Sequence, residues 1–137
     1  MIKLEHIVWH PGYSVQIKAI DEQHQHLFGI VNTLIDLHQH GSDDLLPTFH
    51  GLVDFVSQHF HTEQMAMKKM KYPWLSEHIA QHETFSERVL TFLKDFQADD
   101  VELTLNMIRF LSNWVTNHTL NVDLKYRDYM LKYRFKL

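Results

Sequence analysis

The sequence contains no cysteine, and it has only four glycines and three prolines in 137 residues. Without thiols the chain can form no disulfide and no thiolate metal site, and it has no cysteine nucleophile. Glycine and proline together make up about 5% of the chain, against roughly 12% in average proteins. The turns that a domain of many short strands requires are therefore scarce, and a few long helices are expected instead.

Other absences limit the partners of the protein. The net charge is −4 and the chain shows no concentrated basic patch, so we expect no nucleic-acid binding. No run of apolar residues approaches the 18 or so of a transmembrane helix, and the first residues lack the pattern of a secretory signal. The sequence predicts one cytoplasmic domain, residues 1–137, without membrane insertion. Because no apolar stripe remains outside the helix seams, a monomer is expected.

The apolar residues recur with a period near 3.6 and predict four amphipathic helices, at about 21–40, 44–71, 74–97 and 100–122, after an irregular arm over about residues 1–19. Gly41 is a natural end for the first helix, and Asp99 with Glu102 has the spacing of a capping box for the fourth. Three short connections make neighbouring helices antiparallel. The predicted fold is all-α, an up-down-up-down antiparallel four-helix bundle with an irregular N-terminal arm.

Histidine is abundant, at 12 of 137 residues, and polar side chains interrupt the apolar seams. The interrupting residues are His24, His38, His59, Glu63, His78, His82 and His118. In an antiparallel bundle these positions fall at the same end, except His38, which lies about 21 Å along the helix from His24 and cannot reach the same metals. Asp123 follows His118 by five positions, which is about 140° around an ideal helix, so it joins them only through a local distortion.

Burying polar side chains without partners costs on the order of 1–3 kcal/mol each, so five histidines and two carboxylates at one place indicate bound metal. Seven ligands exceed the four or so of a tetrahedral zinc ion, and two metal ions are indicated. Imidazole with carboxylate suits iron, manganese, copper or zinc. If both carboxylates bridge two six-coordinate metals that also share a solvent-derived bridge, all but one position is filled, and a small ligand can take the open one.

Four blocks in this order carry a resemblance to a known family. They are Ile20-Asp21-Glu22-Gln23-His24, His59-Phe60-His61-Thr62-Glu63, His78-Ile79-Ala80-Gln81-His82, and Trp114-Val115-Thr116-Asn117-His118 followed by Asp123. With Trp9 and Tyr13 in the arm, they cover nearly the whole chain. The sequence resembles the hemerythrin family, and in particular its single-domain bacterial members, the bacteriohemerythrins.

The resemblance implies a non-heme, oxo- or hydroxo-bridged centre of two iron ions that binds dioxygen reversibly. The implied ligands are His24, His59, Glu63, His78, His82, His118 and Asp123. Glu63 and Asp123 are implied to bridge the irons; three histidines, at 78, 82 and 118, belong to the filled iron, and His24 and His59 to the iron with the open position. The implied walls of the dioxygen pocket are Leu27, Phe60, Trp114 and Val115, with Thr119 where an aliphatic residue is expected.

The function implied in this way is that of an oxygen carrier, store or delivery protein and not of an enzyme. Alternatives remain open: a di-iron enzyme or scavenger acting on O2, peroxide or nitric oxide, an O2 or iron sensor, and a metal-storage or zinc-structured module. Ferritin-like oxidases use a Glu-x-x-His motif on each of two helices, and this sequence contains no such motif. A Ser-His-Asp hydrolase is disfavoured because no nucleophile elbow is present.

Overall fold

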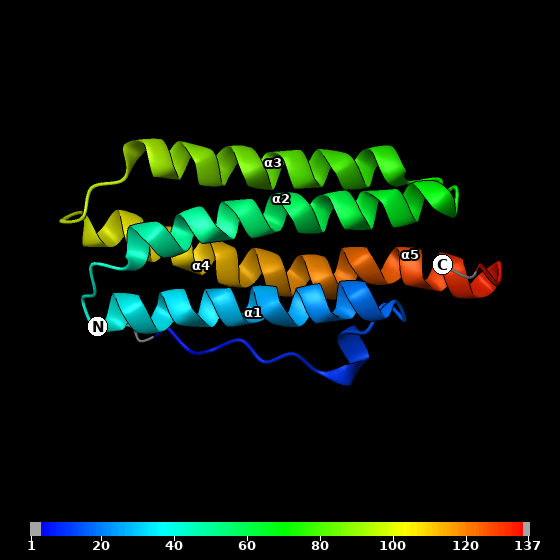
Figure 1. Cartoon of the computed structure of the whole chain (residues 1–137), viewed down its shortest axis with the longest axis horizontal. Coiled ribbons are helices and arrows are strands. Elements are labelled where there is room, and N and C mark those ends of the chain that lie inside the picture. The colour runs from blue at the N-terminus through cyan, green and yellow to red at the C-terminus, as the bar shows by residue number, and fades with distance from the viewer. Residues whose placement is uncertain (1–3, 136–137) are drawn as a thin grey trace.

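The computed structural model describes residues 4–135 and shows helices packed side by side along one axis (Figure 1). The helices are α1 (Lys18–Gln39), α2 (Leu45–Lys69), α3 (Leu75–Asp95), α4 (Val101–Asn117) and α5 (Leu124–Lys132). A π-helical segment, His118–Asp123, joins α4 to α5, and a short 3-10 turn, Pro11–Tyr13, lies in the arm. The predicted all-α four-helix bundle is confirmed, with α4, the π-helical segment and α5 together forming its fourth rod.

The first three predicted helices agree with the structure to within three residues at each end. The predicted fourth helix, 100–122, is wrong in its regularity and its length, because it passes through the π-helical segment and continues to Lys132. The predicted capping box is also wrong. The N-cap of α4 is Asp100, whose side chain accepts a hydrogen bond from the backbone N–H of Leu103 at 3.0 Å. Gly41 does end α1, with the positive φ of 64° that a left-handed cap requires.

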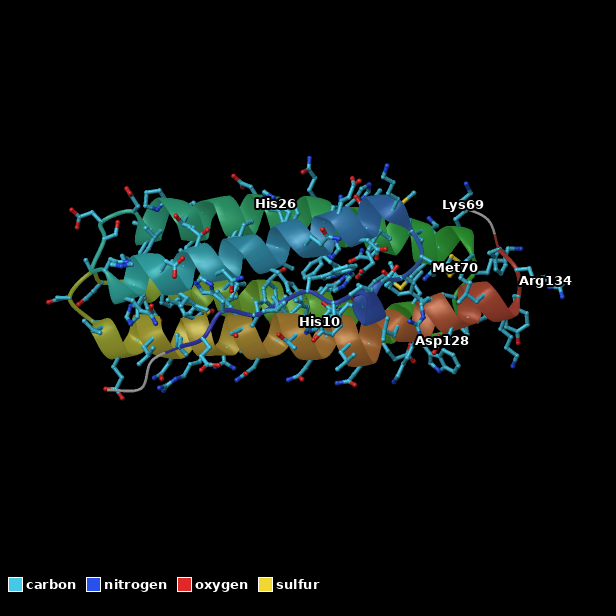
Figure 2. The ribbon with its side chains drawn as sticks, turned by 90° about the horizontal axis from the view of Figure 1, so that it is seen from below. His10, His26, Lys69, Met70, Asp128 and Arg134 are labelled. Carbon is cyan, nitrogen blue, oxygen red and sulfur yellow. The ribbon has the colours of Figure 1, made fainter. Side chains whose placement is uncertain are left out.

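The N-terminal arm runs along the bundle beside α1 (Figures 1 and 2). Asn32 fastens it by two hydrogen bonds to the backbone of Ile7, at 2.8 and 2.9 Å. Apolar arm residues, among them Trp9 and Tyr13, pack against the main core. Residues 1–3 of the predicted arm, and residues 136–137, lie outside the described residues.

Two separate apolar clusters fill the bundle. The larger contains Leu27, Phe60 and Val115 and continues toward the α2 N-terminus, while the smaller gathers Ile20, Met67, Met70 and Tyr126 with their neighbours near the arm and α5. Along α1, His24 lies between Ile20 of the smaller cluster and Leu27 of the larger. The polar group described next therefore lies in a layer that is closed by apolar side chains on both sides.

Candidate metal centre

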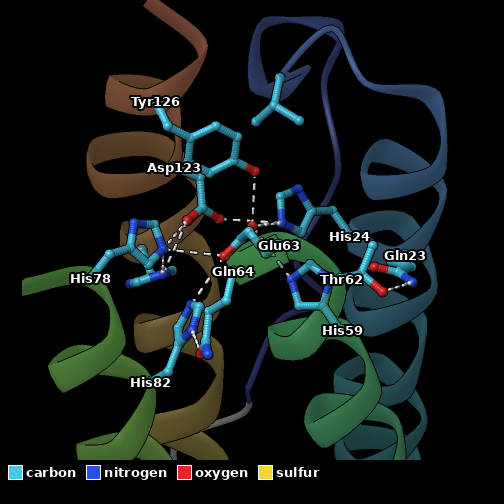
Figure 3. Close-up of polar contacts among 12 residues, drawn as sticks. Gln23, His24, His59, Thr62, Glu63, Gln64, His78, His82, Asp123 and Tyr126 are labelled. Atoms are coloured by element: carbon cyan, nitrogen blue, oxygen red, sulfur yellow. Dashed lines mark hydrogen bonds and ion pairs between the residues drawn. The ribbon is translucent and has the colours of Figure 1, made fainter. Parts of the chain in front are cut away.

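The candidate ligands meet in this polar layer, where Figure 3 labels six of the seven, and none of the seven is more than 5% exposed. α1 supplies His24, α2 supplies His59 and Glu63, α3 supplies His78 and His82, and the π-helical segment supplies His118 and Asp123 at its two ends. Pairs separated by four residues lie on one helical face, which is why α2 and α3 each contribute two side chains. The structure thus brings together every residue that the sequence proposed for the site.

The two carboxylates lie at the middle of the group, and each divides its oxygens between two sets of imidazoles. Glu63 Oε2 lies 3.3 Å from His24 Nε2 and 3.7 Å from His59 Nε2. Its other oxygen, Oε1, lies 3.1 Å from His78 Nε2 and 3.0 Å from His82 Nε2. A carboxylate with one oxygen toward each of two sets has the arrangement of a ligand that bridges two metal ions.

Asp123 repeats this division. Its Oδ2 lies 3.2 Å from His24 Nε2, and its Oδ1 lies 3.0 Å from both His78 Nε2 and His118 Nε2. Within the described residues the ligand atoms form two compact groups that share Glu63: one with His78, His82 and His118, the other with His24 and His59. The geometry therefore offers two adjacent metal positions, with three and two imidazoles.

The π-helical segment solves the spacing of His118 and Asp123. In an α-helix two side chains five residues apart point about 140° away from each other, but the wider i→i+5 turn of a π-helix brings them to one face. Such turns inside α-helices occur frequently at functional sites. The local distortion that the sequence required for Asp123 is present, over His118–Asp123.

Glutamine side chains fix the outer nitrogens of three of the histidines. Gln23 on α1 accepts from His59 Nδ1 at 2.8 Å, Gln64 on α2 from His82 Nδ1 at 2.9 Å, and Gln81 on α3 from His118 Nδ1 at 3.2 Å; these three pairs each join one helix to the next. An acceptor at Nδ1 keeps the proton there and leaves Nε2 free to bind metal. The Nδ1 atoms of His24 and His78 have no such partner among residues 4–135.

Tyr126 on α5 supplies one more contact with the carboxylates. Its side chain is fully buried, and its hydroxyl donates to Glu63 Oε2 at 2.9 Å (Figure 3). Burial and the nearby carboxylates raise the pKa of this phenol well above its usual value. Tyr126 therefore acts at this site as a neutral hydrogen-bond donor.

In the metal-free protein, the pKa values of the buried ligand side chains are shifted in the way expected for a cation-binding site. Burial alone would raise the pKa of Glu63, but the surrounding histidines outweigh it and hold that pKa well below its usual range. Burial lowers the pKa of His59 to about 4. For His24 and His78 burial has the same sense, yet hydrogen bonds to Asp123 and Glu63 outweigh it and raise their pKa values to about 10 and about 9. Protons thus take the place that metal ions would take between the carboxylates and imidazoles.

Aromatic rings cover the three-imidazole side of the group. Phe60 stacks on His82, with ring centroids 3.7 Å apart and planes at 3°, and Trp114 stacks on His118 at 4.2 Å and 10°. Of the other proposed pocket residues, Leu27, Val115 and Thr119 are buried, each at 2% exposure or less. Thr119 is the polar member of the set.

The remaining histidines of the described chain lie away from this group. His26 packs on the ring of Phe55 with centroids 4.5 Å apart, and His6 pairs with Asp36 at 2.6 Å on the surface. Both histidines are exposed, as is His61. His26 and His61 are each two residues from a ligand in sequence but lie on another face of their helices.

A known domain family and several known proteins are similar to this chain over most of its length. The hemerythrin HHE cation binding domain matches residues 15–128. The chain belongs to the hemerythrin family. The bacteriohemerythrin of Pseudomonas aeruginosa is 33% identical over 128 residues, which cover 91% of this chain and 82% of that protein. The bacteriohemerythrin of Methylococcus capsulatus is 29% identical over 115 residues, covering 83% and 88%.

Solved hemerythrin structures have the same fold. The crystal structure of wild-type hemerythrin superposes with a TM-score of 0.81 at 27% identity and covers 89% of this chain and 95% of that one. The hemerythrin of Phascolopsis gouldii is 28% identical over 121 residues, covering 88% of this chain and 90% of that protein. Among residues 4–135 no helix is both long enough and apolar enough to span a bilayer.

The hemerythrin family binds a di-iron centre, and the donor set of this chain fits one. The Nε2 atoms of His78 and His118 lie only 3.1 Å apart, next to Asp123. At that distance one nitrogen donates its proton to the other in the metal-free protein, and a metal ion that replaced this proton would face both lone pairs. Imidazole nitrogens and carboxylate oxygens, with no sulfur donor, are suited to iron.

Reasoning from the sequence missed the three glutamines and Tyr126. A signal was present for the glutamines, since Gln23 precedes His24, Gln81 precedes His82 and Gln64 follows Glu63. A residue next to a ligand lies about 100° around the helix, at the edge of the seam and toward the neighbouring helix. For Tyr126 the signal was its spacing of three residues after Asp123, which places both on one face of a helix.

Proposed function

We propose that this protein binds dioxygen reversibly at a non-heme di-iron centre and acts as an oxygen carrier, store or delivery protein. The observation that carries the proposal is the pair of imidazole groups, three and two, that share both carboxylates. Five neutral imidazoles and two carboxylates form a less anionic donor set than the carboxylate-rich sites of ferritin-like oxidases. That difference favours reversible binding over oxygen activation, and the protein is proposed to be a binding protein and not an enzyme.

The proposed ligand assignment follows the two groups. His78, His82 and His118 hold one iron, His24 and His59 hold the other, and Glu63 and Asp123 bridge them. When bound, the two irons supply the reversible redox chemistry of dioxygen binding. The iron that His24 and His59 would hold has fewer imidazole donors than the other, and it is the one proposed to take dioxygen.

The chain's own part is to hold the ligands and exclude water. The glutamine contacts at Nδ1 fix the rings of His59, His82 and His118. The apolar residues Leu27 and Val115 adjoin the polar layer and limit the access of water, which promotes autoxidation. The proposed pocket also contains Thr119, whose hydroxyl makes this wall less apolar and should raise the autoxidation rate.

The alternatives differ in purpose and not in ligands. They are a scavenger or enzyme acting on O2, peroxide or nitric oxide, a sensor of O2 or iron, and a zinc-structured module. We propose a cytoplasmic monomer, as the sequence predicts.

The deciding experiment is an optical titration of the purified protein. Ferrous iron is added under argon, the iron content is measured, and spectra are taken before O2, after O2, and after O2 is swept out. The proposal expects about two irons per chain and visible charge-transfer bands that appear with O2 and disappear under argon. His118→Ala should abolish the bands, while His26→Ala, an exposed histidine on α1, should leave them unchanged.

Other outcomes contradict the proposal in different ways. Bands that appear once and do not reverse indicate oxidation or turnover in place of carriage. Steady consumption of O2 with an added reductant indicates an enzyme. Zinc as the bound metal of protein purified without added metal, or many irons per chain, indicates a structural or storage role.

A further inference from the structure

A cleft beside the metal centre has no role in the function proposed above. It has a volume of about 700 Å³ and lies between the α2–α3 connection, α3 and α5. Its lining residues are Tyr72, Pro73, Trp74, Glu77, His78, Gln81, Val122, Lys125, Asp128, Tyr129, Lys132 and Tyr133. Small-molecule sites typically have volumes of about 300–1,000 Å³ and mostly apolar linings with a few polar groups, so the cleft has the size and character of such a site.

Four aromatic rings form one continuous wall of the cleft. Tyr72 lies edge-on to Trp74 with ring centroids 5.6 Å apart, and to Tyr129 at 5.5 Å. Tyr129 in turn meets Tyr133 at 4.7 Å. Trp74 and Tyr133 are each 56% exposed, so ring surface faces the opening. Aromatic surface that is held by neighbouring rings and left open to solvent is suited to stacking on a flat molecule.

The charges around the cleft favour an anion. Lys125 and Lys132 are exposed at its rim. Of the two acidic lining residues, Asp128 is engaged by the guanidinium of Arg127 through bonds of 2.8 and 3.0 Å. Glu77 is then the single lining carboxylate without a cationic partner among the described residues, opposite two lysines. The lining carries two positive and two negative side chains, and Arg127 beside Asp128 brings the local sum to one positive charge, although the chain as a whole is negative.

His78 adds a second and independent observation. It lines this cleft, it is 2% exposed, and its Nδ1 has no hydrogen-bond partner among residues 4–135. In the same site three other histidines have their Nδ1 atoms paired with glutamine. When Nε2 faces the metal, Nδ1 carries a proton, and a buried N–H without an acceptor is costly. Because less than 1 Å² of Nδ1 is accessible, an acceptor atom of a molecule in the cleft would satisfy it once the neighbouring lining side chains move aside.

We infer that this cleft binds a planar aromatic molecule that carries an anionic group. The flat ring system stacks on Trp74 and Tyr133, the anionic group faces Lys125 and Lys132, and an acceptor on the ring approaches His78 Nδ1. Through His78 the occupant contacts a proposed ligand of the metal centre, so its presence is sensed at the iron. The aromatic wall and the lysines do not depend on iron, and this site can be tested separately from oxygen binding.

The test uses riboflavin 5′-phosphate as the probe, because its ring system is flat, carries carbonyl acceptors and is fluorescent. The iron-loaded protein is titrated into the probe, and quenching of the flavin fluorescence is followed. Saturable one-to-one quenching is expected. Trp74→Ala removes a stacking surface and should weaken binding by about tenfold, and Lys125→Glu should weaken it by a similar factor. Lys18→Glu, a matched change of a lysine that is 90% exposed on α1, should have no effect.

Two further arms examine the parts of the inference. Riboflavin, which lacks the phosphate, should bind more weakly than the phosphate ester, and inorganic phosphate alone should not displace the probe. Proton NMR of the iron-loaded protein should show one of the exchangeable histidine Nδ1–H signals moving on addition of the probe, with the others unchanged. Absence of saturable quenching, quenching that both Trp74→Ala and Lys125→Glu leave intact, or equal binding of riboflavin each overturns the inference.

Discussion

Replacing Tyr126 by phenylalanine isolates one hydrogen bond at the centre of the bundle. The change removes only the hydroxyl that donates to Glu63 Oε2 at 2.9 Å and leaves the buried ring in place. A hydrogen bond to a charged group contributes about 1.5–3 kcal/mol. The carboxylate of Glu63 is fully buried, so no water replaces the lost donor readily, and we expect the upper half of this range in the metal-free protein.

A loss of this size is measurable by thermal unfolding. For a domain of this length, about 1 kcal/mol corresponds to roughly 3–5 °C in Tm, so the metal-free variant should unfold about 7–15 °C lower than the parent protein. Circular dichroism of both proteins at equal concentration gives the difference. In the iron-loaded protein the bridging metals partly satisfy the same oxygen, and the difference should be smaller.

A matched variant separates the effect of this hydrogen bond on stability from the effect of removing any buried tyrosine hydroxyl. Tyr72 is also buried, at 5% exposure, but within residues 4–135 its hydroxyl donates no hydrogen bond to a carboxylate. Tyr72→Phe should therefore change Tm by less than about 2 °C, which is the scale of a neutral surface change. Equal Tm losses for the two variants, or no loss for Tyr126→Phe, would refute the assignment of a donor role to Tyr126.

Three other outcomes are expected. Gln23→Leu should lower metal affinity by about 10–100-fold, measured by competition with a chelator, whereas Gln25→Leu, exposed on the same helix, should not. Asp100→Ala should cost about 1 kcal/mol of stability in denaturant unfolding, because α4 loses its N-cap. In the metal-free protein, hydrogen bonds to the carboxylates outweigh burial and hold the pKa values of His24 and His78 at about 10 and about 9, against 6.5 when unfolded. The stabilisation of the fold by these two protonated histidines is complete below pH 6.5 and is lost as the pH rises through 9–10. The Tm of the metal-free protein should therefore fall between pH 6.5 and about 10.

The helices and their buried faces could be predicted from the sequence, because the apolar residues that recur with the helical period are those that the bundle buries. The interrupting polar residues could be found for the same reason, since His24 and Glu63 stand where the seam requires an apolar side chain. Two histidines four residues apart, His78 and His82, needed only helical geometry to converge. Antiparallel order then brings such residues from the four rods into one layer, which lies between two apolar clusters.

What remained unpredictable depends on neighbours in space. The N-cap falls at Asp100 and not Asp99 because helix ends follow the tertiary path of the α3–α4 connection. The glutamine contacts depend on the distance between helices, which sequence spacing does not define. The cleft next to His78 requires Tyr133, the residue after α5, and Trp74 to line one space although they are far apart in sequence.

The π-helical segment shows most clearly how the site and the fold depend on each other. A regular helix would direct Asp123 about 140° away from His118, and nothing in the local sequence favours the wider turn. The π-helical turn occurs where both side chains face the other candidate ligands, and His118 Nε2 lies 3.0 Å from Asp123 Oδ1. After Asp123 the chain returns to α-helix, so that Tyr126, three residues later, lies on the same face and reaches Glu63. One irregular turn thus brings both the carboxylate of Asp123 and the hydroxyl of Tyr126 to the candidate metal centre. The helix departs from regular geometry at the position where the site requires it.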